Sequence, residues 1–151
     1  METVQESPAV DNLGLIFDRH LTWDAHISDL VRRCIGLLIG LRHPRHYLPW
    51  GVLRTVVDGL VLSRVRYCVS VYGGGTSKND ARLLKIVNFA TRVITGLGKN
   101  DRIAQVREDL GPMSHLQMYE VSIMTVSHKA ITNGEPLGIS TQITIFRDLL
   151  L

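Results

Sequence analysis

Two cysteines and two histidines in the first half of the chain are the residues best suited to hold a metal ion. They are Cys34, His43, His46 and Cys68. Thiolate sulfur and imidazole nitrogen are preferred zinc ligands, so a zinc site is one hypothesis. The spacing matches no common paired-ligand module, however, and both cysteines fall at apolar positions of an expected helix. Because buried cysteine behaves as a small hydrophobic side chain, the sequence favours core packing for both thiols.

Residues 73–78, GGGTSK, combine three glycines with a threonine, a serine and a lysine. Such residues occur in phosphate-binding loops, but a Walker-type loop has a fixed gap followed by Lys-Ser/Thr, and here the gap is missing and the order is reversed. The G-x-G-x-x-G fingerprint of dinucleotide-binding folds is absent as well. We therefore expect a turn between two helices. Anion binding at the N-terminus of the second helix is the alternative.

The sequence contains no recognisable catalytic constellation. It has no H-E-x-x-H motif, no serine or cysteine in a nucleophile-elbow context, and no Asp-Asp pair or closely spaced acidic cluster of the kind that holds two Mg²⁺ ions. We therefore expect a protein that is not an enzyme and that uses no metal or cofactor.

Basic side chains carry the strongest positive signal. Thirteen of the 17 basic residues are arginine, whose planar fork suits phosphate, and the net charge is +3. Four of these residues are spaced so that they share one helix face opposite an apolar face, as backbone-phosphate contacts would require: Lys78, Arg82, Lys85 and Arg92. A solvated helix face is the alternative interpretation.

A second basic cluster lies in the stretch LRHPRHYLP. Arg42 and Arg45 could contact phosphates there, and the neighbouring Tyr47 could stack on a base. A polar loop is the alternative. Together the two clusters predict contacts with the backbone phosphates of a nucleic acid.

The periodicity of apolar residues predicts a mainly α-helical domain with one short N-terminal strand over residues 10–18. The first helix is expected to begin after a Thr22 cap and to end at Pro44. A second should run from Pro49 to the glycines, although its valine-rich end also fits a strand. A third should begin at a Ser77 cap with Asp80 in a capping box, and end at Gly96 and Gly98.

Two further helices are predicted over residues 102–110 and 114–132. The second should turn one face inward, formed by Leu116, Tyr119, Ile123, Val126 and Ala130. Residues 1–9 are expected to be loose, residues 10–136 to form the domain, and residues 137–151 to form a divergent tail. No apolar signal core or membrane-length apolar run occurs, which predicts an intracellular protein, nuclear or cytoplasmic, without a membrane partner.

Four motifs in order resemble the segment that follows the catalytic palm in reverse transcriptases of non-LTR (LINE-type) retrotransposons. The match covers about residues 10–136. The first two motifs are a Leu-Gly-x-x-x-Asp strand and a Leu-x-Trp-x-x-His-Ile turn and helix, and the last two are a Tyr-Cys pair and an RL-x-K-I-x-N-x-A-x-R-x-I helix. The matching residues are Leu13, Gly14 and Asp18; Leu21, Trp23, His26 and Ile27; Tyr67 and Cys68; and Arg82, Leu83, Lys85, Ile86, Asn88, Ala90, Arg92 and Ile94.

This resemblance implies a helical thumb-like bundle that grips a template–primer duplex, with the basic face of the third helix along the phosphates. It also implies that the fingers and palm, with their Tyr/Phe-x-Asp-Asp metal site, would precede residue 1. We therefore expect a fragment of an RNA-directed DNA polymerase without polymerase activity, and an N-terminal strand left without its sheet partners, which favours self-association. A small helical protein-interaction domain, or an inert transposon relic, is the alternative.

Overall fold

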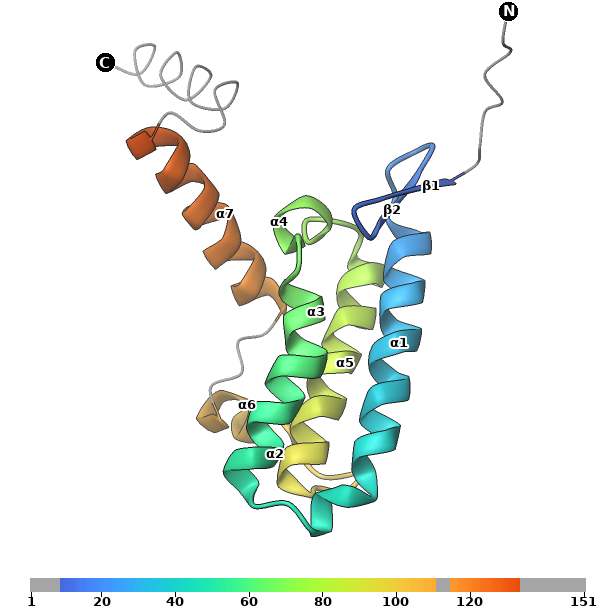
Figure 1. Ribbon diagram of the computed structural model, residues 1–151, viewed down its shortest axis with the longest axis vertical. Coiled ribbons are helices and arrows are strands. Elements are labelled where there is room, and N and C mark those ends of the chain that lie inside the picture. Colours follow the sequence, from blue (N-terminus) through green and yellow to red (C-terminus); the bar gives the residue numbers. More distant parts are fainter. Residues whose placement is uncertain (1–8, 111–114, 134–151) are drawn as a thin grey trace, which may run out of the picture.

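The computed structural model describes residues 9–110 and 115–133, and this part of the chain is mainly helical, as predicted. Three long helical segments run alongside one another (Figure 1). They are α1 (Asp24–Arg42), a rod formed by α2 (Trp50–Val57), the π-helical turn η2 (Asp58–Leu62) and α3 (Ser63–Arg66), and α5 (Ser77–Thr95). The remaining elements are β1 (Ala9–Asn12), β2 (Leu15–Asp18), the 3₁₀ turn η1 (Pro44–His46), α4 (Val69–Tyr72), α6 (Ala104–Leu110) and α7 (His115–Asn133).

The segment predicted as a single strand is a β-hairpin. β1 pairs antiparallel with β2, with Ala9 opposite Asp18. The turn between the strands places Leu13 at φ 53° and Gly14 at φ 81°, and the Gly14 N–H donates to Oδ1 of Asp11 at 3.0 Å. Tight hairpin turns require positive φ at both central residues, and leucine rarely adopts it. Leucine at the first central position therefore obscured the turn, although Asp11, Asn12 and Gly14 are residue types common in turns.

The N-cap position of α1 is Trp23 and not Thr22, which corrects the expected N-terminus, although the Thr22 hydroxyl accepts the Asp24 N–H at 3.4 Å. The Asp18 carboxylate accepts backbone N–H groups from His20 at 3.0 Å, Thr22 at 3.0 Å and Trp23 at 2.9 Å. Trp23 has a φ of 63° immediately before the first helical residue, Asp24. These hydrogen bonds, led by the one from the Thr22 N–H, hold the pKa of Asp18 below its ordinary value.

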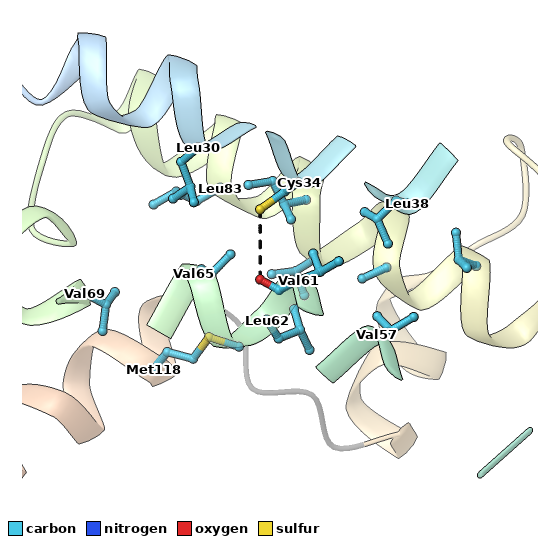
Figure 2. Close-up of a cluster of buried hydrophobic side chains, with 14 of the residues drawn as sticks. Leu30, Cys34, Leu38, Val57, Val61, Leu62, Val65, Val69, Leu83 and Met118 are labelled. Atoms are coloured by element: carbon cyan, nitrogen blue, oxygen red, sulfur yellow. Dashed lines mark hydrogen bonds between the residues drawn. The ribbon is translucent and has the colours of Figure 1, made fainter. Parts of the chain in front are cut away.

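The three long helical segments meet in a core of aliphatic side chains (Figure 2). Cys34 of α1 is fully buried there, with its thiol 4.0 Å from the carbonyl oxygen of Val61. Burial raises the pKa of this thiol to about 11. Core packing is thus confirmed for Cys34, while Cys68 is half-buried at the edge of the core. The fully buried residues of this core include Ile27, Leu38, Val57, Val61, Val65, Ile86 and Val87.

The second helix, predicted as continuous over residues 49–72, is divided. Its rod widens into the π-helical turn η2 and ends at Arg66. The chain is extended at Tyr67 and takes a φ of 53° at Cys68 before the single turn of α4 begins. Arg66 forms a two-bond ion pair with Asp58, with nitrogen–oxygen distances of 2.6 and 3.1 Å. The valine-rich end, whose composition also fitted a strand, is therefore an interrupted helix and not a strand.

The three consecutive glycines form the joint between α4 and α5, as the turn interpretation predicted. They also form a seat for α7. A Cβ atom at Gly73 would lie 2.6 Å from Cδ2 of Tyr119 and 2.5 Å from the Val69 carbonyl oxygen, and one at Gly74 would lie 2.8 Å from the Tyr119 hydroxyl. Only glycine permits so close an approach between the Tyr119 ring and the backbone.

The predicted inward face of α7 is partly wrong. Ala130 is buried, but Leu116 and Ile123 are exposed, and His115 and Met118 are buried in their place. The helix projects from the three-helix body and contacts α3, α4 and α5 (Figure 1). Because apolar residues occur on most sides of α7, their spacing did not select the face that packs.

The two ends of α5 show one error and one success of the sequence prediction. Ser77 is the first helical residue and Thr76 precedes it, without a side-chain cap bond, so the expected capping box is absent. At the other end Gly96 has a φ of 81° and donates its N–H to the Arg92 carbonyl at 2.8 Å. The helix thus ends at a left-handed glycine, at one of the two glycines, Gly96 and Gly98, where the sequence predicted its end.

Candidate nucleic-acid interface

The six predicted phosphate contacts separate into two groups in the structure. Lys78 and Arg82 lie in the first half of α5, beside the start of α1. Arg42, Arg45, Lys85 and Arg92 instead gather where the end of α1, the turn η1 and the part of α5 from its middle to its end meet. The helical face predicted from spacing alone is therefore not one continuous site.

The first group is held by a carboxylate. The Lys78 ammonium nitrogen lies 3.1 Å from Oδ2 of Asp24, and Arg82 Nη1 lies 3.8 Å from Oδ1 of the same residue. Arg82 also donates to the Ser28 hydroxyl at 3.2 Å. The hydrogen bond from Lys78 is the main reason that the pKa of Asp24 lies below its ordinary value. These two cations therefore join α5 to α1 and are partly neutralised.

The second group lines an open groove of about 750 Å³. Its polar lining is basic or neutral, with no aspartate or glutamate among the lining residues of the described part of the chain. Pockets of this size enclose ligands of small-molecule dimensions. We call it the basic groove and define it by its polar side chains: Arg42, His43, Arg45, His46, Lys85, Asn88, Arg92 and Lys99.

Two arginines of the basic groove also hold the backbone together. Arg92 donates to the carbonyl oxygens of Gly98 at 3.0 Å, Lys99 at 3.1 Å and Asp101 at 3.4 Å. The Arg45 guanidinium lies against Gly96 and donates to the Arg92 carbonyl at 3.5 Å. Cations at this position complement the carbonyl-rich end of a helix. Part of the hydrogen-bonding capacity of both side chains is therefore used structurally.

Besides Lys99 in the loop after α5, Arg42 and Lys85 are the cations of the basic groove that remain available to a ligand. Both are exposed, and neither makes a hydrogen bond or ion pair with any residue that the structure describes. They stand on different elements, at the end of α1 and in the middle of α5. A phosphate between them could accept hydrogen bonds from both sides.

Four further residues of the basic groove were not predicted as contacts: His43, His46, Asn88 and Lys99. His43 and His46 are exposed and belong to the LRHPRHYLP cluster, whose composition pointed to them. Lys99 lies in the loop after α5 and carries no periodicity by which the sequence could assign it to the groove. It joins the site because Gly96 ends α5 and the chain then turns back past Arg92.

The proposed zinc ligands do not come together. Cys34 lies in the core, whereas His43 and His46 are exposed at the basic groove. Within residues 9–110 and 115–133, no group of three or more histidine, cysteine, aspartate or glutamate side chains could hold a metal ion. The helices of the same part of the chain include none that is long and apolar enough to span a membrane.

The other motif residues make packing contacts at the hairpin end of the bundle. The Trp23 ring meets Phe17 edge-on with centroids 5.1 Å apart. His26 packs on Tyr72 at 4.9 Å. The Tyr67 hydroxyl donates to the Leu13 carbonyl at 2.9 Å. Within the described residues these contacts join the hairpin to the helices. Trp23, His26 and Tyr67 of the sequence motifs therefore have structural roles.

Comparisons with protein-family models, curated proteins and solved structures found no match to this chain.

Proposed function

We propose that this chain is a nucleic-acid-binding module of the non-LTR reverse-transcriptase type, without a catalytic centre of its own, and that it holds phosphate backbone in the basic groove. The observation that carries the proposal is the convergence of Arg42 and Lys85 from separate elements in a groove whose described lining has no carboxylate. The order of the four sequence motifs supports the family. The absence of any Asp-Asp pair in the sequence is consistent with binding in place of polymerisation.

Binding of this kind is expected to be independent of nucleotide sequence. The side chains that line the groove offer hydrogen-bond donors and positive charge to phosphate oxygens, which are the same at every nucleotide. The RNA–DNA hybrid and the DNA duplex of the parent family are the first ligands to test.

The test is a titration of a labelled RNA–DNA hybrid with the whole chain at several salt concentrations. The informative variant is Arg42→Ala/Lys85→Ala, because both side chains are exposed and make no polar contact in the described part of the chain. The charge-matched control is Arg64→Ala/Lys129→Ala, which removes two exposed cations outside the groove that no carboxylate of the described residues pairs with. Variants of Arg82 or Arg92 are less informative because both residues hold the fold together.

The logarithm of the association constant should fall with the logarithm of salt concentration by about 0.9 per duplex phosphate neutralised. The groove variant should therefore bind more weakly, and the magnitude of its salt slope should be smaller by about two than that of the wild type. The control should stay close to the wild type. Equal losses in both variants would mean that net charge alone attracts the nucleic acid. Absence of binding by the folded wild-type protein would defeat the proposal and leave an inert relic as the alternative.

The second candidate function is protein interaction through α7. Large apolar side chains are exposed along this helix, with 68% of Met124 and 67% of Ile131 accessible. The earlier argument for self-association, an unpaired strand, loses its basis because β1 and β2 pair with each other. Association through α7 would be insensitive to salt, and sedimentation of Met124→Asp/Ile131→Asp beside the wild type would detect it. A monomeric wild type would remove self-association as a function of this face.

A further inference from the structure

The arrangement of charge along α5 argues against a long duplex footprint. Fourteen residues separate Lys78 from Arg92, which corresponds to about 21 Å of helix. Asp24 holds Lys78 and Arg82 at one end, and backbone carbonyls hold Arg92 at the other. Among the four predicted α5 cations only Lys85 lacks a partner within the described residues. The helix therefore offers a compact basic site and not a continuous row of available cations.

The shape of the basic groove favours a narrow ligand. A duplex presents its phosphates on a broad convex surface, whereas a cavity of about 750 Å³ matches one or two nucleotides. A single strand can bend its backbone into such a cavity and turn its bases outward. Arg42 comes from the end of α1 and Lys85 from α5, so the two cations could contact one phosphodiester chain from separate elements.

An exposed aromatic residue follows the groove residues of the turn η1 in the sequence. Tyr47 directly follows His46, a groove residue, and 88% of its surface is exposed. Its backbone N–H donates to the Pro44 carbonyl at 2.9 Å, which fixes the ring's attachment point at the end of the rigid turn η1. An exposed tyrosine on an ordered turn has no packing role, but every nucleic-acid base can stack on it.

From these observations we propose that the basic groove is a sequence-independent site for single-stranded RNA or DNA, with phosphates between Arg42 and Lys85 and a base stacked on Tyr47. This inference rests on the proposed function and narrows it from nucleic acid in general to single strands. Sites of this type combine a basic groove with aromatic stacking platforms and tolerate any sequence.

The experiment compares three labelled ligands of equal length with the whole chain: oligo(U) RNA, oligo(dT) DNA and an RNA–DNA hybrid of mixed sequence. The strand site is probed by Tyr47→Ala, and by Tyr47→Trp, which keeps an aromatic surface. We expect both single strands to bind more tightly than the hybrid. Tyr47→Ala should weaken single-strand binding by about fivefold or more, as the loss of one base–aromatic stack does, while Tyr47→Trp preserves it. Neither variant should change the affinity for the hybrid by more than about twofold.

The two single strands separate RNA from DNA as the source of the phosphodiester chain. The groove pair Arg42→Ala/Lys85→Ala should weaken both single strands, with a loss of salt slope of about 0.7 per phosphate contact removed. Tighter binding of the hybrid, or equal binding of all ligands by Tyr47→Ala and wild type, would overturn the single-strand inference and leave the proposed function standing. Failure of all three ligands to bind the folded protein would remove both.

Discussion

At the scale of single residues, Asp18 organises the connection between β2 and α1 although its side chain lies at the surface. Its two carboxylate oxygens accept hydrogen bonds from three backbone N–H groups and from the Thr22 hydroxyl. These donors belong to the residues that connect β2 to α1. One side chain thus satisfies the donors that precede the helix and fixes the direction in which α1 leaves the hairpin.

Asp18→Asn is expected to lower the melting temperature measurably. The amide keeps one acceptor oxygen and replaces the other with an N–H₂ group, which would face a backbone N–H at His20 or Trp23. Thermal unfolding followed by circular dichroism measures the change. Asp109→Asn is the matched control, because Asp109 is exposed and, among the residues that the structure describes, accepts a hydrogen bond from the Gln105 side-chain amide alone. Equal melting temperatures for Asp18→Asn and this control would show that the turn does not depend on the carboxylate.

Two buried histidines are expected to make the protein less stable in mild acid. Burial lowers the pKa of His26 and, despite the opposing charge of Asp80, that of His115. The unfolded chain therefore binds protons that the folded chain does not. Stability should be constant above the ordinary value of 6.5 and fall as pH drops below it towards the lowered folded values.

Urea unfolding at about pH 8 and about pH 5.5, on either side of the ordinary histidine value, measures this dependence. His26→Gln/His115→Gln should reduce the loss of stability between the two pH values, because glutamine does not titrate there. His128→Gln is the control, since His128 is exposed on α7. An unchanged pH dependence in the double variant would show that other groups dominate.

At the scale of elements, the contact between Gly73 and Tyr119 fixes α7 against the joint that precedes α5. Gly73→Ala should lower the free energy of unfolding by about 1–3 kcal/mol, the range for overpacking a tight contact. The methyl group would meet the Val69 carbonyl as well as the Tyr119 ring, and the backbone cannot move aside as a side chain can. Chemical denaturation measures the loss.

Gly36→Ala provides the matched control for this element. Gly36 lies on the exposed side of α1 with nothing within 4 Å of an added Cβ atom. The same substitution should there stabilise the protein by about 1 kcal/mol, because alanine is the better helix former. Destabilisation of similar size at both positions would mean that the loss at Gly73 does not come from its close contact with Tyr119.

The elements were predictable where a residue type has one local effect. Pro44 and Gly96 ended helices as expected, because a proline ring and a left-handed glycine act on their own backbone. The hairpin was missed because Leu13 takes a conformation that its type disfavours. The basic groove was predicted only in part. Spacing placed Lys78 and Lys85 on one helix face, but the fold pairs Lys78 with Asp24 and brings Arg42 into the same groove as Lys85.

At the scale of the whole molecule, Cys34 can report the opening of the entire bundle. Its thiol is fully buried among all three long helical segments, and its pKa is raised to about 11. A thiol reagent at about pH 8 should modify Cys34 only when the core opens, because the reactive thiolate is then formed. Its labelling rate should therefore rise with urea in parallel with global unfolding.

Cys68→Ser isolates this signal, since Cys68 is half-buried at the edge of the core and should react without global unfolding. The wild type should accordingly show one fast and one slow thiol in native buffer. Rapid labelling of Cys34 in the Cys68→Ser protein would mean that α1 separates from the rod without unfolding of the whole.

The π-helical turn η2 sets the winding of the rod. Leu53, Val57, Val61 and Val65 are all buried and recur at intervals of four residues. In a uniform α-helix each interval of four overshoots a full turn by about 40°, so this row would drift around the axis by about 120°. The wider turn at residues 58–62 absorbs part of that drift, so Val65 stays closer to the direction of Leu53 than it would in a uniform α-helix. Removal of one residue there would restore regular winding and rotate α3, with everything attached to it, by about 100°.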